Sequence, residues 1–205
     1  MNHSRKAFIP AALVAFASIA LIVYSFYASS RGRGHPPNMP AAGARPPGGE
    51  REEGLDPFTL FGTLAVVCGA VSFTWLRFKK KLVSPSPIVK KLAKLLYRVH
   101  PFTGWAALLL IAAHGSYFLV TKLNDHKIYT GLASFLILLA LAGYGFLIKR
   151  VRNKWLRKAH FYLSLLWIPA LLLHAGGSFL GTALATAAVW AAVWLLERAT
   201  QPKPA

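Results

Sequence analysis

Four histidines form two sets with the same spacing. His100 and His114 are 14 residues apart, and so are His160 and His174. Fourteen residues make almost four helical turns, so the two histidines of each set share a face and lie about 21 Å apart along the axis. Because imidazole nitrogens are common metal ligands, this spacing predicts two helices that each carry two metal-binding side chains.

The elements that must position these histidines are membrane helices. The chain has 205 residues, of which 55% are hydrophobic and only 6 are acidic, whereas about a quarter of the residues in a soluble domain are charged. The apolar residues form blocks of roughly 20, the length that crosses a bilayer. We therefore predict an all-α integral membrane protein, a six-transmembrane-helix bundle whose spans cover residues 7–28, 57–77, 102–122, 128–148, 159–177 and 179–197.

The chain divides into four parts. Residues 1–28 form the first membrane helix, which we expect to be a retained anchor, with a secretory signal as the alternative. Residues 29–56 are rich in Pro, Gly and Arg, which predicts a disordered linker outside the membrane. Residues 57–197 form the bundle that carries the four histidines, and residues 198–205 form a cytoplasmic tail.

The segment before the third span carries two further predictions. Its apolar residues recur at helical spacing opposite lysines, which predicts a short helix lying on the membrane surface. Pro101 follows His100, and a proline disfavours helical geometry at the residue before it. The members of the apolar series are Ile88, Leu92, Leu95, Leu96 and Val99.

The basic residues predict the orientation of the bundle. With both termini on one side, that side holds 18 of the 24 Lys and Arg residues and only one acid, Glu197. Basic loops face the cytoplasm, so we expect an N-in, C-in protein of the cell membrane, in a bacterium the plasma membrane. The net charge of +18 follows from this asymmetry, and we expect a lipid bilayer as partner and no nucleic acid.

The topology turns the two spacings into two level pairs. The third and fifth spans run in the same direction, which sets His100 beside His160 (the inner pair) and His114 beside His174 (the outer pair). A bis-imidazole b-type haem needs one neutral nitrogen from each of two facing helices. We therefore expect two b haems, with these four residues as cofactor-binding iron ligands and with no catalytic residue. Two alternatives stay open: a haem-free metal or proton carrier, and histidines that only pack in the core.

Some surrounding residues suit a flat macrocycle. Gly104 lies one turn after His100, and Gly115, Gly176 and Gly177 lie beside the outer pair. Trp167 is seven residues from both histidines of its span, with Ala107 at the matching position on the third span. We expect Trp167 to fill the space between the two haems, with a role in electron transfer as the alternative. Basic residues that could meet haem propionates are Arg98, Lys154 and Arg157 inside and Lys122 and Lys127 outside.

The chain resembles the ferric reductase-like transmembrane domain family over about residues 58–195. The resemblance rests on HPFTGWAALLLIAAHG, a His-x3-Gly-x9-His pattern, on YTGLASFLILLALAGYG, and on WLRKAHFYLSLLWIPALLLHA. It implies haem ligands on the third and fifth of six helices, two stacked b haems, and electrons moving between the membrane faces. The family also includes members with a flavin and NADPH domain, and we expect this chain to act without one because no Gly-rich dinucleotide fingerprint is present.

These observations favour a diheme membrane protein that carries electrons from a cytoplasmic reductant to an external acceptor. We expect the reductant to be a separate flavoprotein or other reductase. The alternative is a stand-alone haem oxidoreductase, a ferric reductase-like enzyme acting on quinol, ferric ion or superoxide. A quinone is therefore a possible second partner.

Overall fold

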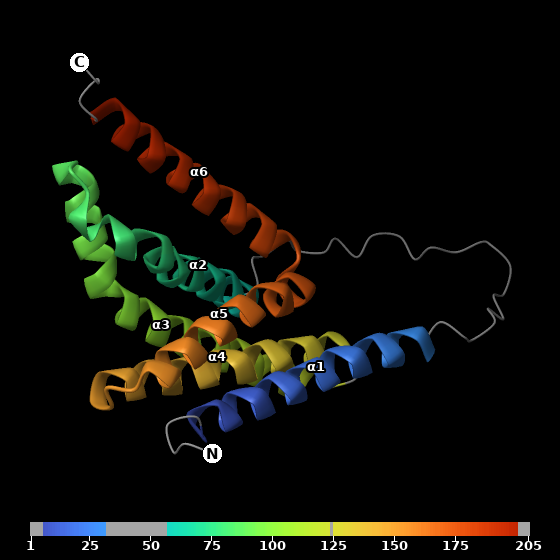
Figure 1. The fold of residues 1–205 in the computed structure, drawn as a ribbon. Coiled ribbons are helices and arrows are strands. Elements are labelled where there is room, and N and C mark those ends of the chain that lie inside the picture. Colours follow the sequence, from blue (N-terminus) through green and yellow to red (C-terminus); the bar gives the residue numbers. More distant parts are fainter. Residues whose placement is uncertain (1–5, 32–56, 124, 201–205) are drawn as a thin grey trace, which may run out of the picture.

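Every regular element in the part of the chain that the structure describes is helical. This computed structural model describes residues 6–31, 57–123 and 125–200. The linker predicted to be disordered lies outside these residues from position 32 onward, as does the tail beyond Thr200. The elements, shown in Figure 1, are α1 (Phe8–Arg31), α2 (Pro57–Phe78), a 3-10 helix η2 (Lys79–Val83), α3 (Pro87–Thr121), α4 (Lys127–Arg150), α5 (Lys154–Ala175) and α6 (Gly177–Thr200).

Five of the described helices are long and apolar enough to cross a membrane. They are α1, α2 with η2, α3, α4 and α6. The fifth predicted span, α5, is not among them, because Lys154, Arg157 and Lys158 occupy its first turns and two histidines lie further along it. The polar residues that make α5 interesting chemically are thus the ones that lower its hydropathy.

The helix α3 corrects the prediction of a separate surface helix. It runs without interruption from Pro87 to Thr121, and both His100 and Pro101 lie inside it. Pro101 lacks the N–H that would bond to the carbonyl one turn earlier, so a bend replaces the predicted break. Figure 1 shows that α3 curves between its two ends. At 1.5 Å per residue, its 35 residues span about 52 Å, well beyond the roughly 30 Å hydrocarbon core.

The first turns of α3 pack on the protein itself. Val89 and Ala93 are buried against Phe78 at the end of α2 and Val193 of α6. The predicted apolar face packs in part: Leu92 and Leu96 contact this cluster, whereas Ile88 and Leu95 remain exposed. This small cluster joins three helices at the inner end of the bundle, the end marked by the inner histidine pair.

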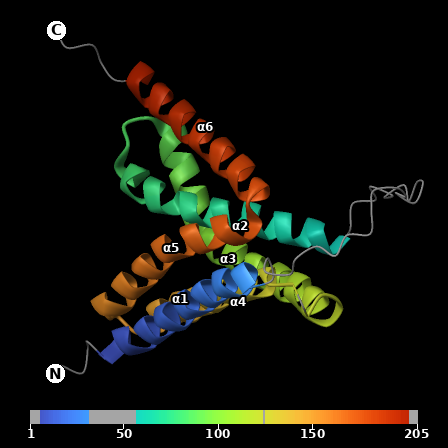
Figure 2. The ribbon, with the colours of Figure 1, turned by 90° about the vertical axis from the view of Figure 1, so that its right-hand side faces the viewer.

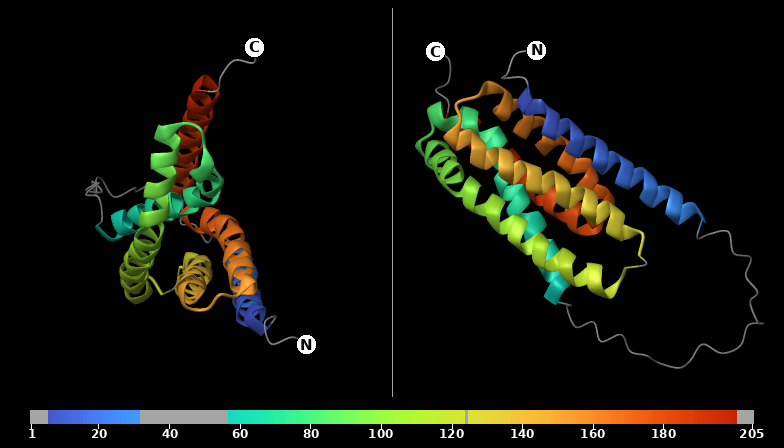
Figure 3. Two further views of the ribbon diagram at one scale, coloured as in Figure 1. Left: turned by 60° about the vertical axis from the view of Figure 1, so that its left-hand side comes forward. Right: turned by 90° about the horizontal axis from the view of Figure 1, so that it is seen from below.

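At the centre of the main core lies α4, which packs against α1, α3 and α5. Figure 2 shows α1 alongside α4, and the left view of Figure 3 shows α4 between α3 and α5. The contact with α1 is polar as well as apolar: Ser18 Oγ donates to the Ala133 carbonyl over 3.2 Å, and Tyr144 Oη donates to the Ala7 carbonyl over 2.6 Å. These bonds at two levels hold α4 in a defined register on α1.

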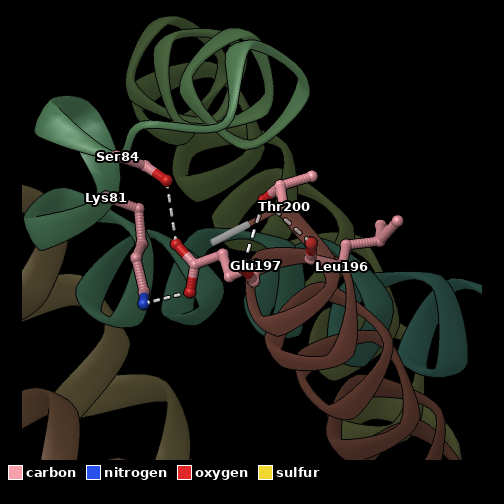
Figure 4. A network of polar contacts seen from close by, with 5 residues as sticks. All are labelled: Lys81, Ser84, Leu196, Glu197 and Thr200. Atoms are coloured by element: carbon pink, nitrogen blue, oxygen red, sulfur yellow. Dashed lines mark hydrogen bonds and ion pairs between the residues drawn. The ribbon is translucent and has the colours of Figure 1, made fainter. Parts of the chain in front are cut away.

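A polar network ties the C-terminal end of α6 to η2. Lys81 Nζ donates to Glu197, and Ser84 Oγ donates to the other carboxylate oxygen over 3.0 Å. Figure 4 shows the carboxylate of Glu197 between these two donors. The network brings the end of α6 to the same end of the molecule as the start of α3. The start of α1 lies at this inner end too, where Phe8 packs edge-on against Trp155.

Candidate haem-binding site

The structure brings the four histidines together in the two predicted pairs. The ring centroids of His100 and His160 are 6.2 Å apart, and those of His114 and His174 are 6.3 Å apart. Because the earlier histidines of α3 and α5 meet each other and the later ones meet each other, the two helices run in the same direction. The level pairing predicted from the equal spacing is confirmed.

The separation of the rings matches ligation of one metal ion by both. A metal–imidazole nitrogen bond is about 2 Å long and the ring centre lies about 1 Å further, so two imidazoles on opposite sides of one ion have centres roughly 6 Å apart. The ring planes are nearly perpendicular, at 81° in the inner pair and 84° in the outer pair. Edge-to-face packing of two rings covers the same range of distances. The hydrogen bonds of the rings therefore distinguish metal ligation from simple packing better than the distance does.

Three of the four histidines have their Nδ1 atoms on backbone carbonyls. The acceptors are Ser72 for His100 at 3.0 Å, Phe58 for His114 at 2.7 Å, and Leu141 for His160 at 3.0 Å. A carbonyl oxygen only accepts, so Nδ1 must carry the proton in each ring. In the neutral ring Nε2 then has a free lone pair, which is the state that a metal ligand requires.

The fourth histidine reaches the same state through a side chain. The Thr130 hydroxyl donates to the Lys127 carbonyl over 2.9 Å, and its oxygen lies 3.2 Å from His174 Nδ1. Since the hydroxyl proton is already committed, the oxygen accepts from His174 Nδ1. All four rings are therefore held as the same tautomer, by partners on α2 and α4.

The two helices that carry the histidines stand apart. Along their described lengths α3 packs on α2, α4 and η2, whereas α5 packs on α1, α2, α4 and α6, and direct contact between α3 and α5 is minimal. Helices that pack directly have axes 8–10 Å apart. Two imidazoles with an ion between them need a wider gap, and α4 maintains it by packing on both helices.

Glycines on the neighbouring helices let the rings approach the backbone. A Cβ on Gly62 of α2 would lie 2.8 Å from His114 Cε1, and one on Gly131 of α4 would lie 2.8 Å from His174 Cε1. Real Cβ atoms do not come so close, so a larger residue at either position would force the ring to shift. At the inner pair the approach is looser, because a Cβ on Gly145 would lie 3.5 Å from His160 Cε1.

The sequence contains a signal for these glycines that the prediction did not use. Gly131 and Gly145 are 14 residues apart, the same spacing as the histidines that they face. The glycines predicted to serve a macrocycle lie elsewhere: a Cβ on Gly104 would have only Ser72 Oγ nearby, at 3.9 Å, and one on Gly115 would have no neighbour within 4 Å. Gly176 has a φ of 49° and ends α5, a helix-terminating role that glycine suits.

Trp167 lies between the two levels, as its position in the sequence predicts. Its side chain is 6% exposed and shares the core with fully buried Ala107. A Cβ on Gly69 of α2 would clash with Trp167 Cη2, so the benzene part of the indole rests directly on the α2 backbone. Trp167 thus fills space between α5 and α2 at the level midway between the pairs.

The chemistry of the donor set fits haem better than a metal ion held by protein alone. Among the described residues no group of three or more His, Cys, Asp or Glu side chains could hold a metal ion. Haem needs only two axial ligands because the porphyrin supplies the other four. Of the remaining histidines, His126 precedes α4 at the surface, while His3 and His35 lie outside the described residues.

No family model, curated protein sequence or solved structure matches this chain. The geometry of the two histidine pairs is therefore the feature that points to a function.

Proposed function

We propose that this protein is a diheme b-type membrane protein that carries electrons across the membrane, as the membrane partner of a separate reductase. The observation that carries the proposal is the level pairing of four histidines at 6.2 and 6.3 Å with all four Nδ1 atoms engaged. Two such pairs at one register are hard to explain by core packing, since a polar ring in hydrocarbon is costly without a partner or a role.

The proposed ligands are His100 with His160 for the inner haem and His114 with His174 for the outer haem. Ser72, Phe58, Leu141 and Thr130 would fix the ring orientations through Nδ1, as second partners of ligating histidines usually do. The haem iron would supply the one-electron redox chemistry. The protein's own contribution is ligation, a spacing of about 21 Å between the levels, and a low-dielectric surrounding.

The proposed topology makes α5 the sixth span, with both termini and the inner pair on the cytoplasmic side. This assignment rests on the basic residues of η2, of the start of α3 and of the α4–α5 connection. In the proposed topology all of them face the cytoplasm. An acidic flavoprotein or other reductase would dock there. We also propose, from the two histidine pairs and their spacing, that the chain is a member of the ferric reductase-like transmembrane domain family.

The test is the visible spectrum and haem content of the purified protein. We expect a b-type Soret band and two haems per chain. His174→Ala should leave one haem, and His160→Ala should leave the other, with different redox potentials in the two single-haem proteins. His126→Ala is the matched control and should keep both haems. A wild-type protein without a Soret band after expression with ample haem would refute the proposal.

The choice of donor is tested separately. Rapid-mixing reduction of the two-haem protein by a co-purifying flavoprotein, compared with reduction by a quinol, would identify the faster donor. We expect the flavoprotein reaction to slow as salt rises, because charge-steered association is screened. Reduction only by quinol, with no dependence on salt, would favour the stand-alone oxidoreductase instead.

A further inference from the structure

The face of α4 that meets the ligand pairs has a symmetric sequence pattern. Lys127, Gly131, Gly145 and Lys149 are separated by 4, 14 and 4 residues. At 100° per residue these four positions fall within about 40° of one another, so they share one face of the helix. The two glycines are the ones that face His174 and His160. One lysine therefore lies a single turn beyond each glycine, toward each end of the span.

Each end of this face repeats the same components. At the inner end, the Leu141 carbonyl accepts from His160 Nδ1, Gly145 lies beside the ring, and Lys149 follows one turn later. At the outer end the lysine comes first along the chain. There Thr130 accepts from His174 Nδ1, Gly131 lies beside the ring, and Lys127 precedes it by one turn.

The lysines lie close to the ligand pairs along the helix. Lys149 is one turn beyond the glycine that faces His160, and Lys127 is one turn beyond the glycine that faces His174. Both lysines are exposed at the ends of α4, where a span meets water. Each is thus placed between a ligand pair and the nearer membrane surface.

A b-type haem carries two propionate carboxylates, and these need compensation at the membrane boundary. A carboxylate left unpaired near hydrocarbon is costly, and a charge-assisted bond to an ammonium group is among the strong hydrogen bonds. We propose that Lys149 and Lys127 bind the propionates of the inner and outer haems. This inference rests on the proposed function, and it assigns the cations to α4 where the sequence pointed mainly to α3 and α5.

The other basic candidates are less well placed at the inner pair. Arg98 is two residues before His100, which puts it on nearly the opposite side of α3. Lys154 is six residues before His160 and lies over the Trp155 ring, 6.0 Å from its centroid. Arg157, three residues before His160, shares more of its face and is the competitor to test.

Arg150 is a natural control for Lys149, and Lys122 is the competitor to test at the outer pair. The Arg150 guanidinium lies 4.6 Å from the centroid of the Phe146 ring, and the Lys122 ammonium lies 5.2 Å from that of Phe118. Arg150 neighbours Lys149 in sequence but points to a different face of α4. Arg150→Gln removes a positive charge at the same membrane boundary without touching the proposed contact.

The test is a potentiometric titration of the full-length protein in detergent or nanodiscs, followed in the visible spectrum. In the His174→Ala protein, which retains the inner haem, Lys149→Gln should lower the midpoint potential, because loss of a nearby positive charge disfavours the added electron. Lys127→Gln should lower the potential of the outer haem in the His160→Ala protein, by less, because Asp125 lies close by and already offsets part of that charge. Lys→Arg at each position should restore most of the shift.

The control Arg150→Gln should leave both potentials within the error of the wild type. A shift of the outer potential produced by Lys122→Gln and not by Lys127→Gln would overturn the outer assignment. Two full haems with unchanged potentials in both lysine variants would overturn the inference while leaving the proposed function intact. A shift produced by Arg157→Gln and not by Lys149→Gln would likewise overturn the inner assignment. A wild type without haem would refute the proposed function itself.

Discussion

The inner and outer histidine pairs have almost the same ring geometry but are supported differently. The outer pair is packed tightly: a Cβ at Gly62 or Gly131 would lie 2.8 Å from a ligand ring. The inner pair has more room, since the corresponding distance at Gly145 is 3.5 Å. Equal spacing of the histidines thus determines where the ligands meet, while the neighbouring helices determine how rigidly each pair is held.

The pairs also differ in what accepts their Nδ1 protons. Both inner histidines donate to backbone carbonyls, of Ser72 and Leu141. In the outer pair His114 does the same with Phe58, whereas His174 is shared between the Thr130 hydroxyl and the backbone of Lys127. A side-chain acceptor is removed by one substitution, whereas a backbone carbonyl is not. The outer pair is therefore the one that single substitutions should damage.

The largest difference between the pairs is expected from adding one methyl group on α4. Gly131→Ala should force the His174 ring away from its partner, and overpacking of this kind costs about 1–3 kcal/mol. Gly145→Ala places its methyl at ordinary van der Waals distance from His160 and should be tolerated. Haem content and thermal stability measure both effects. Gly143→Ala is the control on the same helix, because a Cβ there has no neighbour within 4 Å. Equal losses in the Gly131 and Gly145 variants would contradict the comparison.

A smaller effect is expected from removing the hydroxyl that orients His174. Thr130→Val keeps the shape of the side chain but leaves His174 with only the backbone of Lys127 as a partner. Loss of such a second-shell partner typically weakens metal-site affinity 10–100-fold, so the outer haem should transfer faster to an excess of a haem-scavenging protein. Thr186→Val on α6, whose hydroxyl bonds only within its own helix at Thr182, should not change the transfer rate. An unchanged outer haem in Thr130→Val would show that the hydroxyl does not orient the ligand.

The smallest effect is expected at the inner pair. Ser72 holds His100 through its carbonyl, while its hydroxyl lies 2.6 Å from Thr103 Oγ1. Ser72→Ala removes the hydroxyl and retains the carbonyl. We expect a loss of about 1 kcal/mol in the free energy of unfolding, the usual value of one hydrogen bond, with both haems retained at wild-type potentials. Chemical unfolding measures the stability, and the redox titration measures the potentials. Loss of the inner haem would show that Ser72 supports His100 through its hydroxyl as well as through its carbonyl.

Several features of the fold could be predicted because they depend on local sequence. Apolar blocks of membrane length predict helices whatever surrounds them, and the positions of α1, α2, α4 and α6 agree with the predicted spans to within a few residues. The 14-residue spacing predicts a shared face for the same reason. Given this spacing, the pairing of the histidines at two levels requires only that α3 and α5 run in the same direction.

The continuity of α3 could not be predicted in the same way. Pro101 is a local signal for a break, but Val89 and Ala93 are buried on Phe78 and Val193, and this packing favours a bent helix over an interrupted one. Local propensity gave the wrong answer because the stabilising contacts come from α2 and α6, far away in the sequence.

The sequence by itself determined the helical class, the membrane-length apolar blocks and the register of the four histidines, because periodicity along one helix is a property of the chain alone. Only the tertiary structure decided the tautomer of each ring, the glycines against which the rings lie and the α4 face that carries Lys127 and Lys149. Those features depend on backbone atoms of neighbouring helices. Which carbonyl or Cβ position meets a given imidazole is settled by how the helices pack and not by the spacing within any one of them.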